Sequence, residues 1–164
     1  KIGLIPENRK TQGLVQILPV WENMTMVALD KCKKNGIINY GVIRETCELY
    51  KKSLNVKTPS INTVIQNLSG GNQQKVVLEK WLLRNCDILI LDEPTRGIDV
   101  GTKQEIYQLI KELAEQGKAV IVISSEMPEL IGVSHRVIVM REGQITGEIK
   151  GDEITQEAIM TLAS

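Results

Sequence analysis

Two short stretches of the sequence combine residue types that can bind and activate phosphate groups. In the first, Ser69, Gly70 and Gly71 stand directly before a helix with one apolar side, within residues 66–83 (QNLSGGNQQKVVLEKWLL). A purely structural explanation exists, because serine is a good N-cap residue and glycines are common before helices. Two consecutive glycines, however, leave backbone N–H groups bare where the positive end of the helix dipole points outward. Such an arrangement suits an anion, and a phosphate above all.

The second stretch is DILILDEPTRGID, in which Asp92 and Glu93 follow the four apolar residues 88–91. A strand that simply exits to solvent is the alternative explanation, and a lone Asp-Glu pair often has no other meaning. In open α/β sheets, however, ligands bind at the carboxyl ends of the strands. We therefore expect Asp92 to hold Mg²⁺, usually through water, and Glu93 to orient or deprotonate the water that attacks a terminal phosphate.

Apolar runs that alternate with helical patterns must position these residues. Short runs rich in Ile, Leu and Val predict strands at 2–5, 88–91, 119–123, 137–140 and 145–149. Helical periodicity is found after Ser69 and near 21–31, 38–54, 102–116 and 154–162. Continuous apolar strands separated by helices predict an α/β fold with a parallel sheet covered on both faces.

Composition excludes several classes of function. The 164 residues make one domain or part of one, with 20 basic and 20 acidic side chains and only two Trp and three Tyr, so nucleic acid is a poor candidate for a direct partner. The longest apolar runs hold about five residues, far fewer than the ~20 that span a bilayer, and no signal peptide is recognisable, so we expect a cytosolic chain. Cys32, Cys47 and Cys86 lack CxxC spacing and are expected to be reduced thiols rather than disulfides or zinc ligands.

Three motifs carry a resemblance to a known family. LSGGNQQK (68–75) resembles the signature motif of ABC-type ATPases, ILILDEP (88–94) resembles their Walker B motif, and GID (97–99) resembles their D-loop. In that family the three motifs follow one another in the same order. Further stretches, among them IPENRK, TRGIDVGTKQEIYQLI and VIVMREGQITGEI, are similar to the second ATPase half of the tandem ATPases that drive ribose- and galactose-type monosaccharide importers. The resemblance covers essentially the whole chain and implies a P-loop NTPase-like parallel sheet with an inserted helical subdomain.

The resemblance also implies a subdivision of the chain, cofactors and site residues. Residues 1–19 would form the Q-loop region, 20–85 a helical subdomain with the signature motif, and 86–164 the Walker B, D-loop and switch regions with the C-terminal strands and helix. ATP and Mg²⁺ would be the cofactors, with Glu93 as the catalytic residue and Asp92 at the metal. The residues implied to face nucleotide are Glu7, Leu68, Ser69, Gly70, Gly71, Asn72, Gln73, Asp99 and Ser125.

Partners follow from the same resemblance. Two ATPase halves pack head to tail in this family, so each signature motif faces the nucleotide held by the P-loop of the other half. The implied partners are the other ATPase half in the same polypeptide, membrane permease subunits and, indirectly, a sugar-binding protein. The chain itself would lie peripherally at the cytoplasmic face of the cell membrane. Met24 and Met26 would then line a docking groove for the membrane subunit, although core positions explain them equally well.

The sequence departs from the family pattern at three points. No stretch matches the P-loop GxxxxGK[ST], so we expect this chain to be part of an ATPase domain that by itself neither binds ATP tightly nor hydrolyses it. Glu7 stands where the family usually has Gln, and its charge would repel the γ-phosphate unless a metal or Arg9 intervenes. Ser125 stands where the family usually has His, and the only histidine, His135, is expected at the surface without a catalytic role. The chain's own site is therefore expected to be slow, whereas its signature motif is intact.

The missing P-loop strand has a consequence for the sheet. In the family it lies inside the sheet, so strands 2–5, 88–91 and 119–123 should form one block, and the segment 137–149 should lack its neighbour. An unpaired apolar strand is a template for association. We therefore expect the isolated chain to oligomerise.

Two other functions stay open at the level of sequence. A DNA-repair or chromosome-organising ATPase would share the signature and Walker B chemistry, but such proteins usually carry long heptad arms, which the ~60 residues between Pro6 and Ser69 cannot hold. A non-catalytic interaction module would fit the missing P-loop. It would have no physical need for Glu93.

Overall fold

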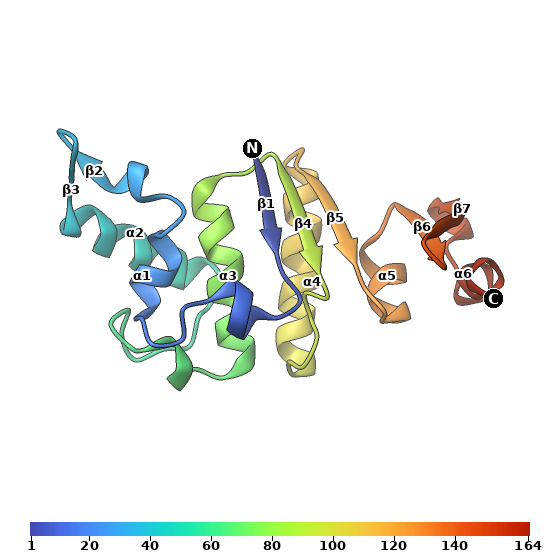
Figure 1. Ribbon diagram of the computed structural model, residues 1–164, viewed down its shortest axis with the longest axis horizontal. Coiled ribbons are helices and arrows are strands. Elements are labelled where there is room, and N and C mark those ends of the chain that lie inside the picture. The colour runs from blue at the N-terminus through green and yellow to red at the C-terminus, as the bar shows by residue number, and fades with distance from the viewer. The chain divides into compact units, whose positions relative to one another are not determined.

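The computed structural model describes all 164 residues, in two compact units that comprise residues 1–123 and 124–164. The first unit (Figure 1) holds β1 (Ile2–Ile5), the π-helical turn η1 (Arg9–Gly13), α1 (Val20–Thr25), the 3-10 turn η2 (Leu29–Cys32), β2 (Lys33–Lys34), β3 (Ile37–Ile38), α2 (Tyr40–Ser53), the 3-10 turn η3 (Ile65–Asn67), α3 (Gly70–Arg84), β4 (Ile88–Asp92), α4 (Val100–Glu115) and β5 (Ala119–Ile123). The second unit holds α5 (Met127–Val133), β6 (Arg136–Arg141), β7 (Gln144–Lys150), the 3-10 turn η4 (Gly151–Glu153) and α6 (Gln156–Ala163). None of the helices combines the length and apolar character needed to cross a membrane.

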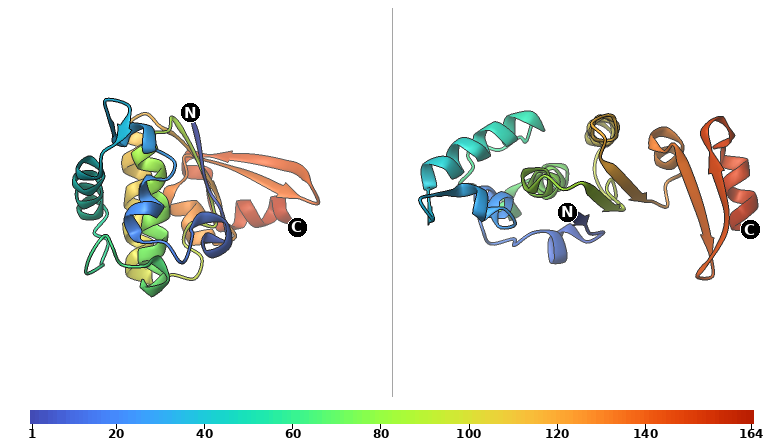
Figure 2. Two further views of the ribbon diagram at one scale, coloured as in Figure 1. Left: turned by 60° about the vertical axis from the view of Figure 1, so that its left-hand side comes forward. Right: turned by 90° about the horizontal axis from the view of Figure 1, so that it is seen from above.

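A three-stranded parallel sheet organises the first unit. Its order is β1-β4-β5, with Ile5 opposite Leu91 and Leu91 opposite Val122. The expected block of three strands is therefore confirmed, and the α/β fold with it. Helices α3 and α4 lie on the same face of this sheet, as the right-hand view of Figure 2 shows. The side chains of Ile5 and Leu91 point to that face and are fully buried.

The opposite face of the sheet is apolar and exposed, so the prediction of a sheet covered on both faces is wrong. Ile2 is 64% exposed and Ile121 is 51% exposed, and Leu4 and Ile123 on the same face are exposed as well. A continuous apolar strand looks the same in sequence whether one or two layers cover it, because the pattern records hydrophobicity and not neighbours. Oligomerisation of the isolated chain, which the sequence predicts from an unpaired strand, stays a prediction.

The helical part of the first unit packs α1 and α2 against α3. The helix expected over 21–31 is shorter, since α1 ends at Thr25 and the turn η2 follows separately. A small hairpin of β2 and β3 was not predicted, although its turn residues Asn35 and Gly36 both have positive φ angles, which are typical of Asn-Gly turns. Met24 is fully buried, so it belongs to the core rather than to a docking groove, whereas Met26 is partly exposed.

The second unit is an antiparallel hairpin covered by a helix. Strands β6 and β7 pair antiparallel across the two-residue turn Glu142-Gly143, where both φ angles are positive. A turn this short cannot join parallel strands, so this region does not extend the parallel arrangement predicted from its apolar runs. Helix α6 completes a core made of Val137, Val139, Ile149, Ile154 and Ile159. Helix α5 was not predicted.

A buried carboxyl group lies among the helices of the first unit. Glu79 of α3 is fully buried, and neither of its carboxyl oxygens has a hydrogen-bond partner. Burial raises the pKa of this group from its ordinary value of 4.5 to about 8, although the charge of Lys75 opposes the shift. The pKa of Tyr50 on α2 is also raised, chiefly by burial and further by the charge of Glu79. Glu79 is therefore mainly protonated in the folded protein at neutral pH.

We predict that the free energy of unfolding falls as the pH rises from 4.5 to about 8. In this range the folded state keeps the Glu79 proton whereas the unfolded state has released it, so each pH unit lowers stability by up to about 1.4 kcal/mol. Glu79→Gln should flatten this dependence, and the same change at the exposed Glu45 of α2 should not. Urea unfolding at about pH 5 and about pH 8 measures the difference. Equal slopes for wild type and Glu79→Gln would contradict the prediction.

Candidate functional site

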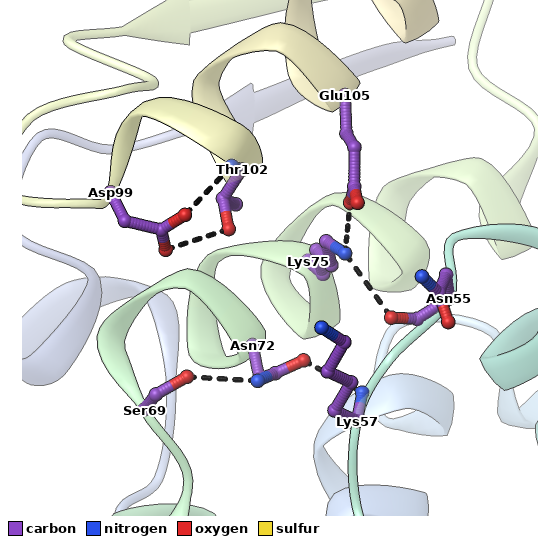
Figure 3. Close-up of polar contacts among 8 residues, drawn as sticks. All are labelled: Asn55, Lys57, Ser69, Asn72, Lys75, Asp99, Thr102 and Glu105. Carbon is purple, nitrogen blue, oxygen red and sulfur yellow. Dashed lines mark hydrogen bonds and ion pairs between the residues drawn. The ribbon is translucent and has the colours of Figure 1, made fainter.

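Residues 65–72, called here the signature segment, lead into the N-terminus of α3 without a side-chain cap. Ser69 occupies the N-cap position, but its hydroxyl makes no capping hydrogen bond. It accepts instead from Nδ2 of Asn72 at 2.8 Å, and Oδ1 of Asn72 accepts from the backbone N–H of Lys57 at 2.7 Å, as Figure 3 shows. The structural explanation of Ser69 as a capping side chain is therefore wrong. The first backbone N–H groups of α3 therefore have no capping side chain, and such uncapped N–H groups are what an anion site at a helix N-terminus uses.

Gly71 is also required by close packing, which the sequence did not reveal, and Gly70 lies against the end of the Arg9 side chain. A Cβ atom added at Gly71 would lie 2.8 Å from Oγ1 of Thr102, in the first turn of α4. A Cβ atom added at Gly70 would lie 2.7 Å from Nη2 of Arg9. Such distances force a neighbour to move, which is costly for the short side chain of Thr102 and cheap for the flexible end of Arg9. The two glycines thus allow the start of α3 to touch both α4 and the segment that follows β1.

Gln73 and Leu68, both predicted to face nucleotide, are buried instead of lying at the surface. Gln73 is buried, and its side-chain amide donates to the carbonyl oxygens of Ile65 at 3.1 Å and Leu68 at 3.3 Å. Leu68 is buried as well. Their side chains hold the loop in shape, and any part they take in nucleotide binding stays a prediction.

Lys75 ties α3 to two other segments. Its side chain is buried, its Nζ donates to the carbonyl oxygen of Asn55 at 3.1 Å, and it forms an ion pair with the exposed Glu105 of α4 (Figure 3). Sequence reasoning assigned Lys75 only to a motif and gave it no role of its own. The available signal was its position one turn before Glu79, because two charged residues on one face of a core helix usually have specific neighbours.

Asp99 of the D-loop motif caps α4. Its carboxylate accepts from the backbone N–H of Thr102 at 3.0 Å and from the Thr102 hydroxyl at 2.8 Å. These hydrogen bonds hold the pKa of Asp99 below its ordinary range. Asp99 is therefore fixed and ionised at the start of α4, and its contact with nucleotide stays a prediction.

Asp92 and Glu93 lie at the carboxyl end of the central strand, where ligands bind in such sheets. Asp92 is the last residue of β4 and is in register with Ile123 of β5. Glu93 has a φ angle of +46°, in the left-handed region, while its N–H donates to the carbonyl oxygen of Ile123 at 2.8 Å. A non-glycine residue in this region is strained, and such strain is concentrated at functional sites.

Glu7 forms its ion pair with an arginine that sequence reasoning did not consider. It forms an ion pair with Arg96, whereas the guanidinium of Arg9 donates to the carbonyl oxygens of Arg96 at 3.0 Å and Gly97 at 3.4 Å. These residues line a cavity of about 290 Å³ together with Asn8 and Lys10. The sequence pointed to a metal or Arg9 as groups that could offset the charge of Glu7, whereas the structure pairs Glu7 with Arg96, which was not considered.

The remaining predicted residues belong to the second unit. Ser125 follows β5 by two residues, and its role as a switch residue stays a prediction. His135 precedes β6 and is exposed, which confirms its expected place at the surface.

No group of three or more Asp, Glu, His or Cys side chains forms a cluster that could hold a metal ion. A metal at Asp92 would therefore take most of its ligands from water and substrate, as Mg²⁺ commonly does.

Residues 1–96 match the family model described as ABC transporter. A relative from Geobacillus kaustophilus is 55% identical over 163 residues, 99% of this chain and 32% of that protein, and carries the provisional name ribose/galactose/methyl galactoside import ATP-binding protein. A relative of the same provisional name from Halalkalibacterium halodurans is 53% identical over 99% of this chain and 31% of that protein. The xylose import ATP-binding protein XylG of Geobacillus kaustophilus is 51% identical over 99% of this chain and 32% of that protein. The chain thus spans about one third of the length of these curated relatives.

Solved structures share the fold. A dimeric ATP-binding cassette in a post-hydrolysis state, bound to ADP and phosphate, matches with a TM-score of 0.78 at 27% identity over 92% of this chain and 62% of that one. A second dimeric structure of a bacterial ABC transporter cassette matches with a TM-score of 0.75 at 26% identity, with the same coverage of both chains.

We predict that Gly71→Ala destabilises the protein by about 1–3 kcal/mol, because the added methyl group would overlap Thr102. Thr102→Ala removes the overlapping hydroxyl and methyl groups, so the double variant should lose less stability than the sum of the two single variants. Gly132→Ala in α5 is the matched control, since its methyl group would meet nothing within 4 Å. A double-mutant cycle by urea unfolding measures the coupling. Additive effects would show that close approach to Thr102 is not what requires glycine here.

Proposed function

The chain belongs to the ABC transporter family, and from this premise we propose that it forms part of the ATP-hydrolysing subunit that powers the import of a monosaccharide of the ribose or galactose type. The observation that carries the proposal is the pair at the end of β4, where Glu93 is held in a strained backbone conformation directly after Asp92. The relatives support the sugar class, since their names specify ribose, galactose, methyl galactoside and xylose import.

In the proposed pair of ATPase halves each nucleotide site contains residues of both halves. Asp92 and Glu93 would supply the chemistry of the site that holds this half's own nucleotide, called here the chain's own half-site. Asp92 would hold Mg²⁺, whose charge offsets that of the phosphates. Glu93 would accept a hydrogen bond from the attacking water and orient it toward the terminal phosphate. The strained backbone at Glu93 fixes where its carboxylate emerges from the sheet, so the water can be held in place before reaction.

The signature segment serves a second nucleotide, held by the other ATPase half. Ser69, Gly70 and the uncapped start of α3 would face the terminal phosphate there, in the head-to-tail arrangement of two halves. The solved cassettes described as dimeric support such an arrangement. A P-loop for the chain's own half-site would come from residues outside these 164, because none of them forms one. Membrane permease subunits, which the chain would contact at the cytoplasmic face of the membrane, and a sugar-binding protein would complete the importer.

The two half-sites are unequal in this proposal. The chain's own half-site has Glu7 and Ser125 at positions where the family usually has Gln and His, so it hydrolyses ATP slowly. The ion pair with Arg96 offsets the charge of Glu7 without restoring the amide of a glutamine. Glu7 and Ser125 do not belong to the half-site that the signature segment completes, and that half-site therefore does most of the hydrolysis.

In the full-length protein, Ser69→Asp should lower ATP hydrolysis at least about tenfold, because a carboxylate at the N-cap stabilises the helix but repels a phosphate. Ser69→Asn introduces a side chain of the same size as Asp without its charge, so as the matched control it should lower hydrolysis less than Ser69→Asp does. Glu93→Gln should change total hydrolysis less than about twofold, since it acts on the slow half-site. Steady-state phosphate release measures all three. If Glu93→Gln abolished most of the turnover, the assignment of unequal sites would be wrong, and a wild type unable to hydrolyse ATP would refute the ATPase role.

Isothermal titration calorimetry with ATP and Mg²⁺ tests the division of the nucleotide site. The 164-residue chain should show no binding in the micromolar range, because it has no P-loop to hold the phosphates. The full-length protein should bind. Micromolar binding to the chain alone would mean that the start of α3 is a nucleotide site in its own right.

A further inference from the structure

Arg9 lies where three segments of the first unit meet. Its Nη1 donates to the carbonyl oxygen of Arg96 at 3.0 Å and its Nη2 to that of Gly97 at 3.4 Å, both in the segment between β4 and α4. The same Nη2 would lie 2.7 Å from a Cβ atom at Gly70, so it touches the first residue of α3. One guanidinium thus joins the segment after β1, the signature segment and the segment that leads to the D-loop.

The Arg9 side chain is partly buried and is held by specific contacts. Its Nε is buried and has no hydrogen-bond partner, and burial lowers the pKa of the guanidinium. The nearby carboxylate of Glu7 pairs with Arg96 instead. Arg9 therefore donates to two successive backbone carbonyl oxygens, those of Arg96 and Gly97. A planar guanidinium can reach both at once, whereas a lysine ammonium cannot make both hydrogen bonds in the same geometry.

The contact has a clear geometric effect. Gly97 has a φ angle of +68°, so the chain reverses sharply there, and Asp99 begins α4 two residues later. Arg9 holds the carbonyl oxygen of Gly97 while it touches Gly70, and therefore sets the spacing between the signature segment and the D-loop. Thr102 against Gly71 fixes the same two segments one turn further along.

We propose that Arg9 is a positioning residue for ATP hydrolysis, which holds the signature segment and the D-loop at the spacing needed to meet the nucleotide of the other ATPase half. This inference rests on the proposed function and adds a residue to it. Arg9 acts through the two segments and does not touch the nucleotide. Its loss should therefore slow turnover while leaving the affinity for ATP nearly unchanged.

The kinetic test uses the full-length protein with Arg9→Met, Arg9→Lys and, as a matched control, Arg44→Met at an exposed arginine of α2. We expect Arg9→Met to lower kcat at least about tenfold, since small displacements of positioned groups cost large factors in rate, with KM for ATP within about twofold. Arg9→Lys should recover part of kcat, because an ammonium group can still reach one carbonyl. Arg44→Met should match wild type. A raised KM with unchanged kcat, or no change in either, would overturn the proposal.

Hydrogen exchange gives a readout that does not depend on activity. In Arg9→Met the amides of residues 66–72 and 95–100 should exchange faster together, whereas in Arg44→Met they should not. Unchanged exchange in both segments would overturn the proposal even if the wild type failed to hydrolyse ATP, a failure that would refute the proposed function separately. If Arg9→Met does not fold, Arg9→Lys decides the question, because wild-type kcat and wild-type exchange in that variant would equally overturn the proposal.

Discussion

The close approach of α3 to α4 is the constraint on which the site depends. Gly71 allows the first turn of α3 to rest on Thr102, and Thr102 is itself held by the carboxylate of Asp99. Any side chain at Gly71 would push the two helices apart. Because Asp99 follows the strand that ends in Asp92, the spacing of these helices also sets where the signature segment stands relative to the sheet.

Buried polar side chains on α3 hold the loops around it. Gln73 donates to two carbonyl oxygens of the signature segment, Lys75 to that of Asn55, and Lys80 to that of Gly13 at 2.5 Å. Carbonyl groups in such irregular segments need partners when they are buried, and a helix can supply them only through long side chains. The helix thus serves as a scaffold for the loops rather than as an amphipathic surface helix.

Two residues with positive φ angles follow the carboxyl end of β4. Glu93 is strained in this left-handed region, whereas Gly97, a few residues later, adopts it without steric penalty because it has no side chain. Arg9 and Arg96 hold this segment from the side of β1, through carbonyl groups and through Glu7. Strain at Glu93 persists because these neighbours fix the segment on both sides.

The sequence by itself determined the strands β1, β4 and β5, the helix after Ser69 and the position of Asp92 and Glu93 at the end of a strand, because these depend on local hydrophobic patterns and on residue types at fixed spacing. Only the tertiary structure decided the partner of Glu7, the burial of Gln73 and Lys75, the steric need for glycine at 71 and the hairpin of β6 and β7. Each of these depends on which distant segments come to lie side by side. A pattern of hydrophobicity along the chain records burial on average, but it does not record the identity of the neighbour.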